Sequence, residues 1–253
     1  MDLATYLSQD HQGISVIIPA RNEARNLQHV LPRIPSCVHE VILVDGHSTD
    51  DTIAEAKRLH PGIRILEQSG RGKGDAIKMG LAAATGSIMV LLDADGSADP
   101  LEIYDFVDAL LAGNDFAKGS RFIKGGKSHD ITLLRRAGNY GLILLVNLLF
   151  KTRFTDLCYG YNAFWKHCVA HIDIDSDGFE IETLINLRMH LASLKIAEVP
   201  SIEYPRIHGL SNLNAIQDGW RILKLILQER KRKKLRLAIP IVQNQTVLEE
   251  VVL

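Results

Sequence analysis

The chain has 253 residues, of which 46% are hydrophobic and 23% charged, a composition typical of a globular domain with a sizeable core. Its formal net charge of −1 gives no indication of a nucleic-acid-binding protein. The three cysteines, Cys37, Cys158 and Cys168, show neither paired nor metal-ligand spacing, which argues against disulfides and against a zinc site.

Short aliphatic runs alternate with helical patterns over the first half of the chain. Each run has the length of a buried strand, and each segment between runs is long enough for a crossover helix. This alternation predicts a Rossmann-like α/β fold, with a doubly wound, mostly parallel sheet flanked by helices. The expected strands are 14–18, 41–44, 63–66, 88–92 and 115–119, and the expected helices are 22–34, 49–59, 75–84 and 100–111.

The pattern changes after Arg121, where strands no longer alternate regularly with helices. A stretch of Gly, Lys and Ser predicts a loop, and a long amphipathic helix is expected near the end of the chain. We expect an α/β domain over residues 1–215, followed by an amphipathic basic helix and tail over 216–253. The elements expected in this half are a loop at 125–128, helices at 133–150, 179–191 and 217–236, and a strand at 195–199.

Polar residues follow four of the expected strands directly. In an open parallel sheet, ligands bind beyond the carboxyl ends of the strands, so these residues are expected around one cleft. Four successive strand ends with polar, acidic or Gly-rich sequences favour a binding site over chance placement. The segments are 19–23 (PARNE), 45–50 (DGHSTD), 70–75 (GRGKGD) and 93–95 (DAD).

Asp93 and Asp95 follow the fourth expected strand. Two carboxylates one residue apart can bind a hard divalent cation whose remaining positions face a diphosphate. Such a cation neutralises the charge that develops on a departing nucleotide diphosphate. The same residues also suit an ordinary turn and helix cap. Their position after a buried strand of this architecture favours the metal site.

Asp45 ends the second expected strand, where a carboxylate can accept hydrogen bonds from a ribose or a base. The residues that follow it also suit a helix cap, and both roles are compatible. Three glycines alternate with Arg71 and Lys73 in a basic loop at an expected helix start, a place where a backbone can approach phosphates. The loop is neither a Walker A loop nor a dinucleotide fingerprint, and by itself a flexible surface turn explains it equally well.

Together these motifs resemble glycosyltransferase family 2, which has a GT-A fold, and in particular its polyprenyl-phosphate (dolichol-phosphate) mannose and glucose synthase branch. The first-half motifs are general to the family, whereas the downstream motifs point to this branch. The resemblance implies a nucleotide-binding half over about 13–120 and an acceptor half over about 121–215. The motifs are 17–23 (IIPARNE), 44–52 (VDGHSTDDT), 72–76 (GKGDA), 92–95 (LDAD), 119–121 (GSR), 156–160 (DLCYG), 179–182 (FEIE) and 206–211 (RIHGLS).

The resemblance implies an inverting, metal-dependent hexosyltransferase that uses a UDP- or GDP-hexose. Asp93 and Asp95 would bind Mg²⁺ or Mn²⁺, and Arg121 and Arg206 would face phosphates of donor or acceptor. The chain departs from the mannose synthases at Ser97, where they have a metal-binding Gln, and Arg135 and Arg136 do not align in register with the family's arginines. The implied donor-binding residues are Pro19, Ala20, Arg21, Glu23, Asp45, Gly72, Lys73, Asp93, Ala94, Asp95 and Ser211.

Two classes of acceptor remain open at this stage. A lipid phosphate is already anionic, so arginines that position the two reactants would suffice. A hydroxyl of a glycan or small molecule needs a carboxylate base, for which Asp156, Glu180 and Glu182 are candidates, although they also suit a turn and a first helical turn. An inactive regulator that binds a sugar nucleotide is a further alternative, against which the intact aspartate pair argues. The implied catalytic set is Asp95, Arg121, Asp156, Glu180 and Arg206.

The expected C-terminal helix combines an apolar stripe around Trp220 with a basic stretch at 230–236 (RKRKKLR). Such a helix either lies on an anionic leaflet or packs on the domain with a solvated basic end, and the sequence leaves both open. Residues 1–13 lack the pattern of a secretory signal. The longest nearly apolar run, 142–150, is shorter than the ~20 residues of a membrane span. We therefore expect a cytoplasmic protein, with peripheral attachment to the inner face of the membrane as the open question.

Overall fold

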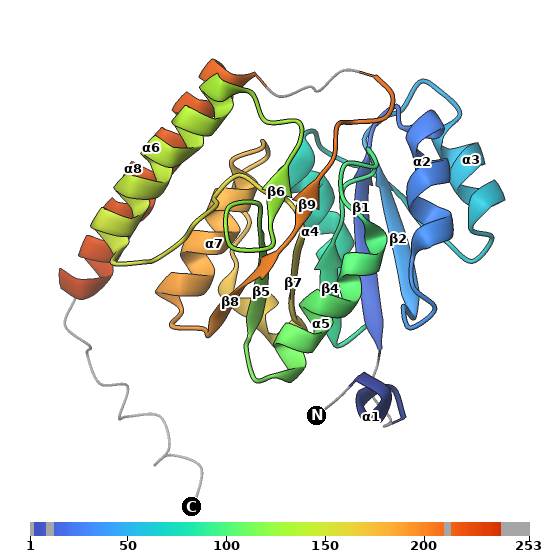
Figure 1. The fold of residues 1–253 in the computed structure, drawn as a ribbon, viewed down its shortest axis with the longest axis horizontal. Coiled ribbons are helices and arrows are strands. Elements are labelled where there is room, and N and C mark those ends of the chain that lie inside the picture. Colours follow the sequence, from blue (N-terminus) through green and yellow to red (C-terminus); the bar gives the residue numbers. More distant parts are fainter. Residues whose placement is uncertain (1–2, 9–12, 210–213, 239–253) are drawn as a thin grey trace, which may run out of the picture.

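The computed structural model describes residues 3–8, 13–209 and 214–238. Seven strands form one central sheet: β1 (Ile14–Ala20), β2 (Glu40–Asp45), β3 (Arg64–Glu67), β4 (Ile88–Leu91), β5 (Phe116–Ser120), β7 (Asn162–Trp165) and β8 (Ile196–Pro200). Their order is β3-β2-β1-β4-β7-β5-β8 (Figure 1). Neighbours pair in parallel except at β7, which is antiparallel to β4 and to β5. The expected α/β fold with a mostly parallel sheet is confirmed.

Helices cover both faces of the sheet, because successive residues of a strand point to opposite sides. Val16 and Ile18 of β1 join one core with residues 24–30 and 103–111, whereas Ile17 joins the other core with residues 73–83 and 181–191. Each face is therefore closed by its own apolar layer. The α-helices are α1 (Leu3–Ser8), α2 (Ala24–Val30), α3 (Thr52–Leu59), α4 (Lys73–Ala83), α5 (Ile103–Leu111), α6 (Leu133–Phe150), α7 (Ile181–Leu191) and α8 (Ala215–Ala238).

Several expected elements differ from the structure in extent or kind. The helix expected over 22–34 ends at Val30 and continues as the 3-10 helix η1 (Leu31–Arg33), with Pro32 in its first turn. The loop expected over 125–128 contains the short strand β6 (Lys127–Ser128), which pairs with β9 (Ile202–Glu203). Neither α1 nor β7 was expected from the sequence. The remaining 3-10 helices are η2 (Pro100–Glu102) and η3 (Lys166–His171).

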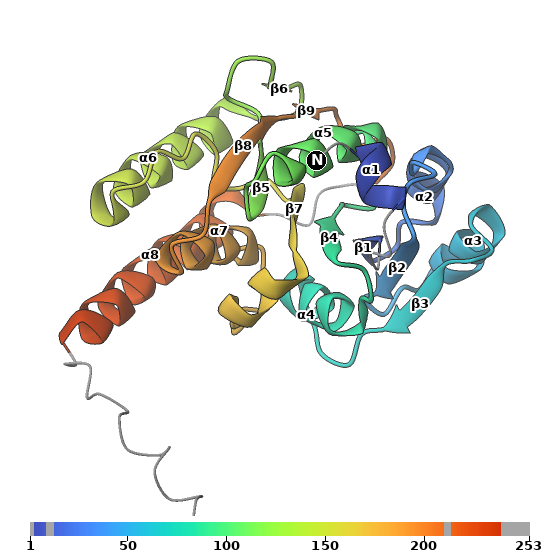
Figure 2. The same ribbon diagram turned by 90° about the horizontal axis from the view of Figure 1, so that it is seen from below.

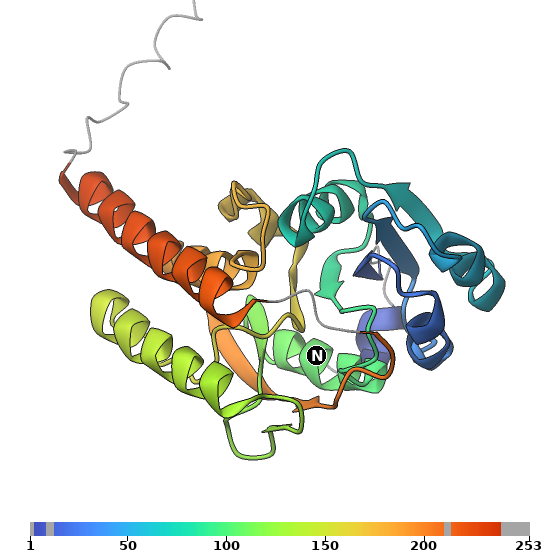
Figure 3. The ribbon, with the colours of Figure 1, turned by 90° about the horizontal axis from the view of Figure 1, so that it is seen from above.

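The long helices α6 and α8 lie side by side at one edge of the molecule (Figures 1–3). Val146 and Phe150 of α6 share a small core with Ile222 and Ile226 of α8. By length and composition, α6 is apolar enough to cross a membrane, with a mean hydropathy of 1.2 over 18 residues, and only 22% of it is buried. The nine-residue apolar run expected at 142–150 forms the C-terminal half of this helix, whose N-terminal half carries Arg135 and Arg136.

Candidate active site

The carboxyl ends of β1, β2 and β4 meet at one edge of the sheet because these strands are parallel neighbours. Ala20 of β1 lies in register with Asp45 of β2, and Ile17 of β1 lies in register with Leu91 of β4, two residues before Asp93. α4 begins at Lys73 beside the same edge, since its side chain reaches Asp93. The polar segments predicted to share a cleft are therefore brought together.

Lys73 joins Asp93 to Glu182, a residue of the first turn of α7. Its Nζ lies 2.6 Å from Asp93 Oδ1 and 2.8 Å from Glu182 Oε1. Burial by itself would lower the pKa of Lys73, but the two carboxylates raise it above its usual value, so this lysine stays charged. Burial raises the pKa of Glu182 while Lys73 lowers it, and the net direction is upward. Glu182, rather than Glu180, is thus the carboxylate that Lys73 joins to Asp93.

Asp95 is joined to a second cation, Arg206, from the loop that follows β9. Arg206 Nη2 lies 3.4 Å from Asp95 Oδ2, and its Nη1 donates to Glu23 Oε1 at 2.9 Å. The backbone N–H of Ser97 donates to Asp95 Oδ1 at 3.0 Å and orients the carboxylate. Burial raises the pKa of Glu23, although Asn26 and Arg206 oppose the shift. Each aspartate of the pair thus has its own cation.

Asp45 has one carboxylate oxygen without a hydrogen-bond partner in the part of the chain that the structure describes. The residue is 4% exposed, and its Oδ2 accepts from the backbone N–H of Ser48 at 3.0 Å. Its Oδ1 is buried and unpaired within the described residues. A buried acceptor without a donor costs free energy unless a ligand or water supplies the hydrogen bond. Asp45 is therefore suited to receive an N–H or O–H group from a bound molecule.

The glycine loop before α4 is held closely against residues 175–178. A Cβ on Gly72 would lie 2.1 Å from the backbone oxygen of Asp177, and one on Gly74 would lie 1.8 Å from that of Ser176. Gly72 also has a φ of +88°, which a side chain would strain. The N–H of Gly74 donates to the Asp177 oxygen at 2.9 Å. The glycines thus allow a close backbone contact on the side of the loop that faces α7.

Arg121 and Asp156 form a buried ion pair, 3% and 0% exposed, and do not face the cleft. Arg121 Nε donates to Asp156 Oδ2 at 2.7 Å, and its Nη1 donates to Glu203 Oε1 at 2.9 Å. Asn139 donates to Asp156 Oδ1 at 3.0 Å. Burial alone would raise the pKa of Asp156, but Arg121 holds it below its usual value. This geometry argues against Asp156 as a base and against Arg121 as a phosphate ligand, because both side chains are buried and already paired with each other.

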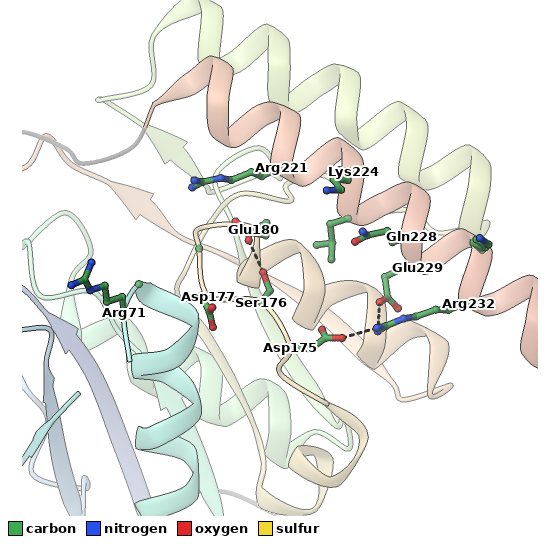
Figure 4. A pocket seen from close by; sticks show the side chains of 14 residues that line it. Arg71, Asp175, Ser176, Asp177, Glu180, Arg221, Lys224, Gln228, Glu229 and Arg232 are labelled. Carbon is green, nitrogen blue, oxygen red and sulfur yellow. Dashed lines mark hydrogen bonds and ion pairs between the residues drawn. The ribbon is translucent and has the colours of Figure 1, made fainter. Parts of the chain in front are cut away.

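Glu180 lines a cavity of about 840 Å³ between residues 175–178, Gly72 and α8 (Figure 4). Its Oε1 accepts from the Ser176 hydroxyl at 2.6 Å, and its buried Oε2 has no partner among the described residues. In Figure 4, Arg71 lies on one side of the cavity, and Arg221 and Arg232 extend from α8 on the other. The acidic and basic lining suits a charged or strongly polar occupant.

The aspartate pair is a suitable donor set for a hard divalent cation. Asp93 and Asp95 have side chains 34% and 21% exposed, so their oxygens are accessible while Ala94 between them is buried. Carboxylate oxygens are the ligands that Mg²⁺ and Mn²⁺ prefer. No group of three or more His, Cys, Asp or Glu side chains with metal-binding geometry occurs within residues 3–8, 13–209 and 214–238. Any such cation would therefore need oxygens of a ligand or water to complete its coordination.

The outcome for the other donor-binding predictions varies along the chain. Pro19, Ala20 and exposed Arg21 lie at the end of β1, next to Asp45, as expected. Ser211 lies outside the residues that the structure describes. Sequence reasoning missed Gly160, where a Cβ would lie 2.7 Å from Lys73 Nζ and 2.9 Å from Asp93 Oδ2. Gly160 belongs to the 156–160 motif, but no role at the site was assigned to it.

The paired aspartates and their cations lie beyond the carboxyl ends of the strands, which is where open α/β sheets bind ligands. The model of the family described as glycosyl transferase family 2 matches residues 15–171, and the chain belongs to this family. The chain is 32% identical over 209 residues to a dolichol-phosphate mannosyltransferase from Pyrococcus furiosus, with 79% of this chain and 59% of the relative covered. It is 31% identical to the glycosyltransferase AglJ from Haloferax volcanii, with 82% and 68% covered. The resemblance seen in the sequence is confirmed, although the chain spans less than two thirds of the Pyrococcus relative.

A solved structure supports the type of fold. Glucosyl-3-phosphoglycerate synthase from Mycobacterium tuberculosis, in complex with Mn²⁺, UDP and glucosyl-3-phosphoglycerate, superposes with a TM-score of 0.70 at 23% identity. The match covers 87% of this chain and 80% of that one. The expected GT-A type of fold is therefore confirmed.

Proposed function

We propose that this chain transfers a hexose from a nucleoside diphosphate sugar to a polyprenyl phosphate, with inversion at the anomeric carbon. The observation that carries the proposal is the accessible pair Asp93 and Asp95, at the same edge of the sheet as the unpaired oxygen of Asp45, with β1 between them. Membership of glycosyl transferase family 2 supports the reaction class, and the name of the Pyrococcus relative supports a lipid phosphate as acceptor.

The proposed donor site assigns a role to each polar group at the sheet edge. Asp45 accepts a hydrogen bond from the nucleoside, because its Oδ1 is buried and has no donor within the described chain. Asp93 and Asp95 would hold Mg²⁺ or Mn²⁺, which neutralises charge on the leaving nucleoside diphosphate. Lys73 and Arg206 already contact these aspartates and add two positive charges next to the diphosphate.

The proposed acceptor needs orientation more than proton removal. A phosphate monoester is anionic near neutral pH, so one of its oxygens can attack the anomeric carbon while the nucleoside diphosphate leaves. Bringing two anions together is costly unless cations neutralise them. Arg71 and Lys224 line the cavity near the glycine loop and have no ion pair with the residues that the structure describes, so they are cations available for this role. No catalytic base is required by this reaction.

Glu180 favours a second candidate, transfer to a hydroxyl. Glu180 lines the cavity, and its buried Oε2 has no partner in the described structure, so this carboxylate is a candidate base for a hydroxyl acceptor. The two candidates differ in one test: release of UDP or GDP from UDP- and GDP-hexoses, measured with and without EDTA, with a polyprenyl phosphate or a glycan added. Metal-dependent release that needs the lipid supports the first candidate, and release that needs the glycan supports the second. Nucleotide binding without turnover on any acceptor identifies a regulator.

We further propose that the α6–α8 edge rests on a membrane surface. Tyr140, Leu144 and Leu148 repeat every four residues on α6 and are each more than half exposed, as is Trp220 on α8. The described part of the basic stretch, 230–233, continues α8 beyond this apolar surface. Aromatic and aliphatic side chains next to cations suit an anionic leaflet. Because α6 packs along α8, we propose that it lies on the bilayer and does not cross it.

Flotation with vesicles tests the membrane proposal. The full chain should float with vesicles that contain phosphatidylglycerol and much less with pure phosphatidylcholine. A Leu144→Ser, Leu148→Ser variant should lose flotation, whereas Leu101→Ser, on η2, should keep it although Leu101 is also exposed. Equal flotation of both variants contradicts the assignment of this surface.

A further inference from the structure

Residues 175–178 form the wall against which the glycine loop is held. The Gly74 N–H donates to the Asp177 backbone oxygen, and Gly72 and Gly74 approach this wall more closely than any side chain would permit. Lys73 lies between these two glycines, and its Nζ contacts Asp93 and Glu182. The backbone on both sides of Lys73 is therefore packed against this wall, while the lysine ammonium contacts Asp93.

Two arginines from different helices hold the wall through one residue, Asp175. Arg188 of α7 donates to Asp175 Oδ1 at 2.8 Å, and Arg232 of α8 donates to Asp175 Oδ2 at 2.7 Å. Both arginines also contact Glu229 of α8, at 2.8 Å and 3.0 Å. Figure 4 shows the contacts of Arg232 with Asp175 and Glu229. Buried Ile174 adds an apolar anchor next to Asp175.

We propose that Asp175 is a positioning residue of the donor site, and that through Arg232 it couples the C-terminal helix to the glycine loop. The donor-site part of this inference, that Asp175 affects nucleotide binding, rests on the proposed function. The mechanical part, that Asp175 and Arg232 hold the glycine loop in place, does not. Both carboxylate oxygens of Asp175 accept hydrogen bonds from guanidinium groups, so these contacts depend on the charge and on the shape of its side chain. Arg232 belongs to the basic stretch of α8, so the same residue links the proposed membrane-facing helix to the loop that carries Lys73.

Asp175→Asn is the direct test, since it removes the charge with little change of volume. Asp173→Asn is the matched control, because Asp173 is exposed in the same segment and its side chain has no hydrogen bond or ion pair with the described residues. Glu229→Gln is a second control, because it weakens the contacts of both arginines with residue 229 but leaves their bonds to Asp175. Arg232→Gln tests the coupling to α8 itself.

Hydrogen exchange of the ligand-free full-length chain tests the mechanical part. The peptide that covers residues 70–77 should exchange faster in Asp175→Asn than in wild type, and at the wild-type rate in Asp173→Asn. Arg232→Gln should show an intermediate increase, because Arg188 still holds Asp175. Equal exchange of this peptide in wild type and Asp175→Asn overturns the inference, whether or not the chain binds a nucleotide.

Calorimetric titration with UDP and with GDP, in the presence of Mn²⁺, tests the donor-site part. Affinity for the nucleotide that wild type binds should fall about fivefold in Asp175→Asn, because a displaced Lys73 loses part of its contact with the diphosphate. The nucleotide affinity should not change in Asp173→Asn, and the Glu229→Gln variant should bind the nucleotide more tightly than the Asp175→Asn variant does. An equal loss of nucleotide affinity in Asp175→Asn and Glu229→Gln would show that the packing of the helices alone causes the loss, and it would overturn the positioning role of Asp175. If wild type binds neither nucleotide, the proposed function fails while the exchange result still decides the mechanical part.

Discussion

Removal of the Lys73 ammonium should leave two carboxylates facing each other in a buried site. Its Nζ lies 2.6 Å from Asp93 and 2.8 Å from Glu182, whose side chain is 11% exposed. Loss of one partner of a buried ion pair costs about 3–5 kcal/mol, because the remaining charge is left without compensation. Asp93 is about one third exposed and keeps part of its hydration. We therefore expect Lys73→Met to lower the free energy of unfolding by about 3 kcal/mol at neutral pH.

The pH dependence of this loss gives a sharper test. Burial already raises the pKa of Glu182, and without Lys73 the pKa should rise further. The folded variant then binds a proton at Glu182 that the unfolded chain does not bind, so its stability increases as pH falls. The difference in unfolding free energy between Lys73→Met and wild type should therefore shrink in mildly acidic buffer. Lys73→Met with Glu182→Gln should regain most of the stability but not the nucleotide affinity.

Urea unfolding at neutral and at mildly acidic pH, followed by tryptophan fluorescence, measures these differences. Lys78→Met is the matched control, because Lys78 is exposed on the same helix and has no ion pair with the described residues. Two results would refute the placement of a charged lysine between two carboxylates. One is a Lys73→Met variant that is as stable as the control at neutral pH. The other is a difference in unfolding free energy between variant and wild type that widens in acid.

Three further predictions concern the neighbours of this site. Gly160→Ala should weaken nucleoside diphosphate binding about tenfold by calorimetry, because its Cβ would lie 2.7 Å from Lys73 Nζ, and unchanged binding would contradict the geometry. Asp156→Asn should lower the free energy of unfolding by about 3 kcal/mol in urea, since it breaks the buried pair with Arg121. Because the folded-state pKa of Asp156 is lowered, this pair stabilises the fold above the unfolded pKa, and the wild-type advantage should disappear as pH falls through the lowered value. Glu180→Gln should leave turnover with polyprenyl phosphate within about twofold of wild type, and a loss of about a hundredfold would instead identify Glu180 as a general base.

The sequence was sufficient to predict the strands that carry the site. β1, β2 and β4 are short aliphatic runs followed by polar residues, and the rule that ligands bind beyond the carboxyl ends of parallel strands placed Asp45, Asp93 and Asp95 together. α6 was predicted with its observed bounds because its apolar pattern is long and ends before a polar loop. These features depend on local sequence, which is why they could be predicted.

The partners of the site residues could not be predicted in the same way. Lys73 and Glu182 are 109 residues apart, and Glu23 and Arg206 are 183 apart, so only the folded chain shows that they pair. The expected roles of Arg121 and Asp156 rested on a family resemblance that does not show burial. β7 was missed because its four residues give no alternating pattern, and its antiparallel direction depends on the strands on either side of it.

The binding of a nucleoside diphosphate in the presence of Mn²⁺ tests the central claim most directly, with the Asp93→Asn, Asp95→Asn double variant compared with wild type by calorimetry. Asp108→Asn provides the control, because this substitution removes the same kind of charge from an exposed position on α5, outside the site. We predict that wild type and the control bind UDP or GDP more tightly with Mn²⁺ than with EDTA, and that the double variant loses this metal-dependent gain. A double variant that retains the full gain would contradict the assignment of the aspartate pair as the site that holds the donor's diphosphate.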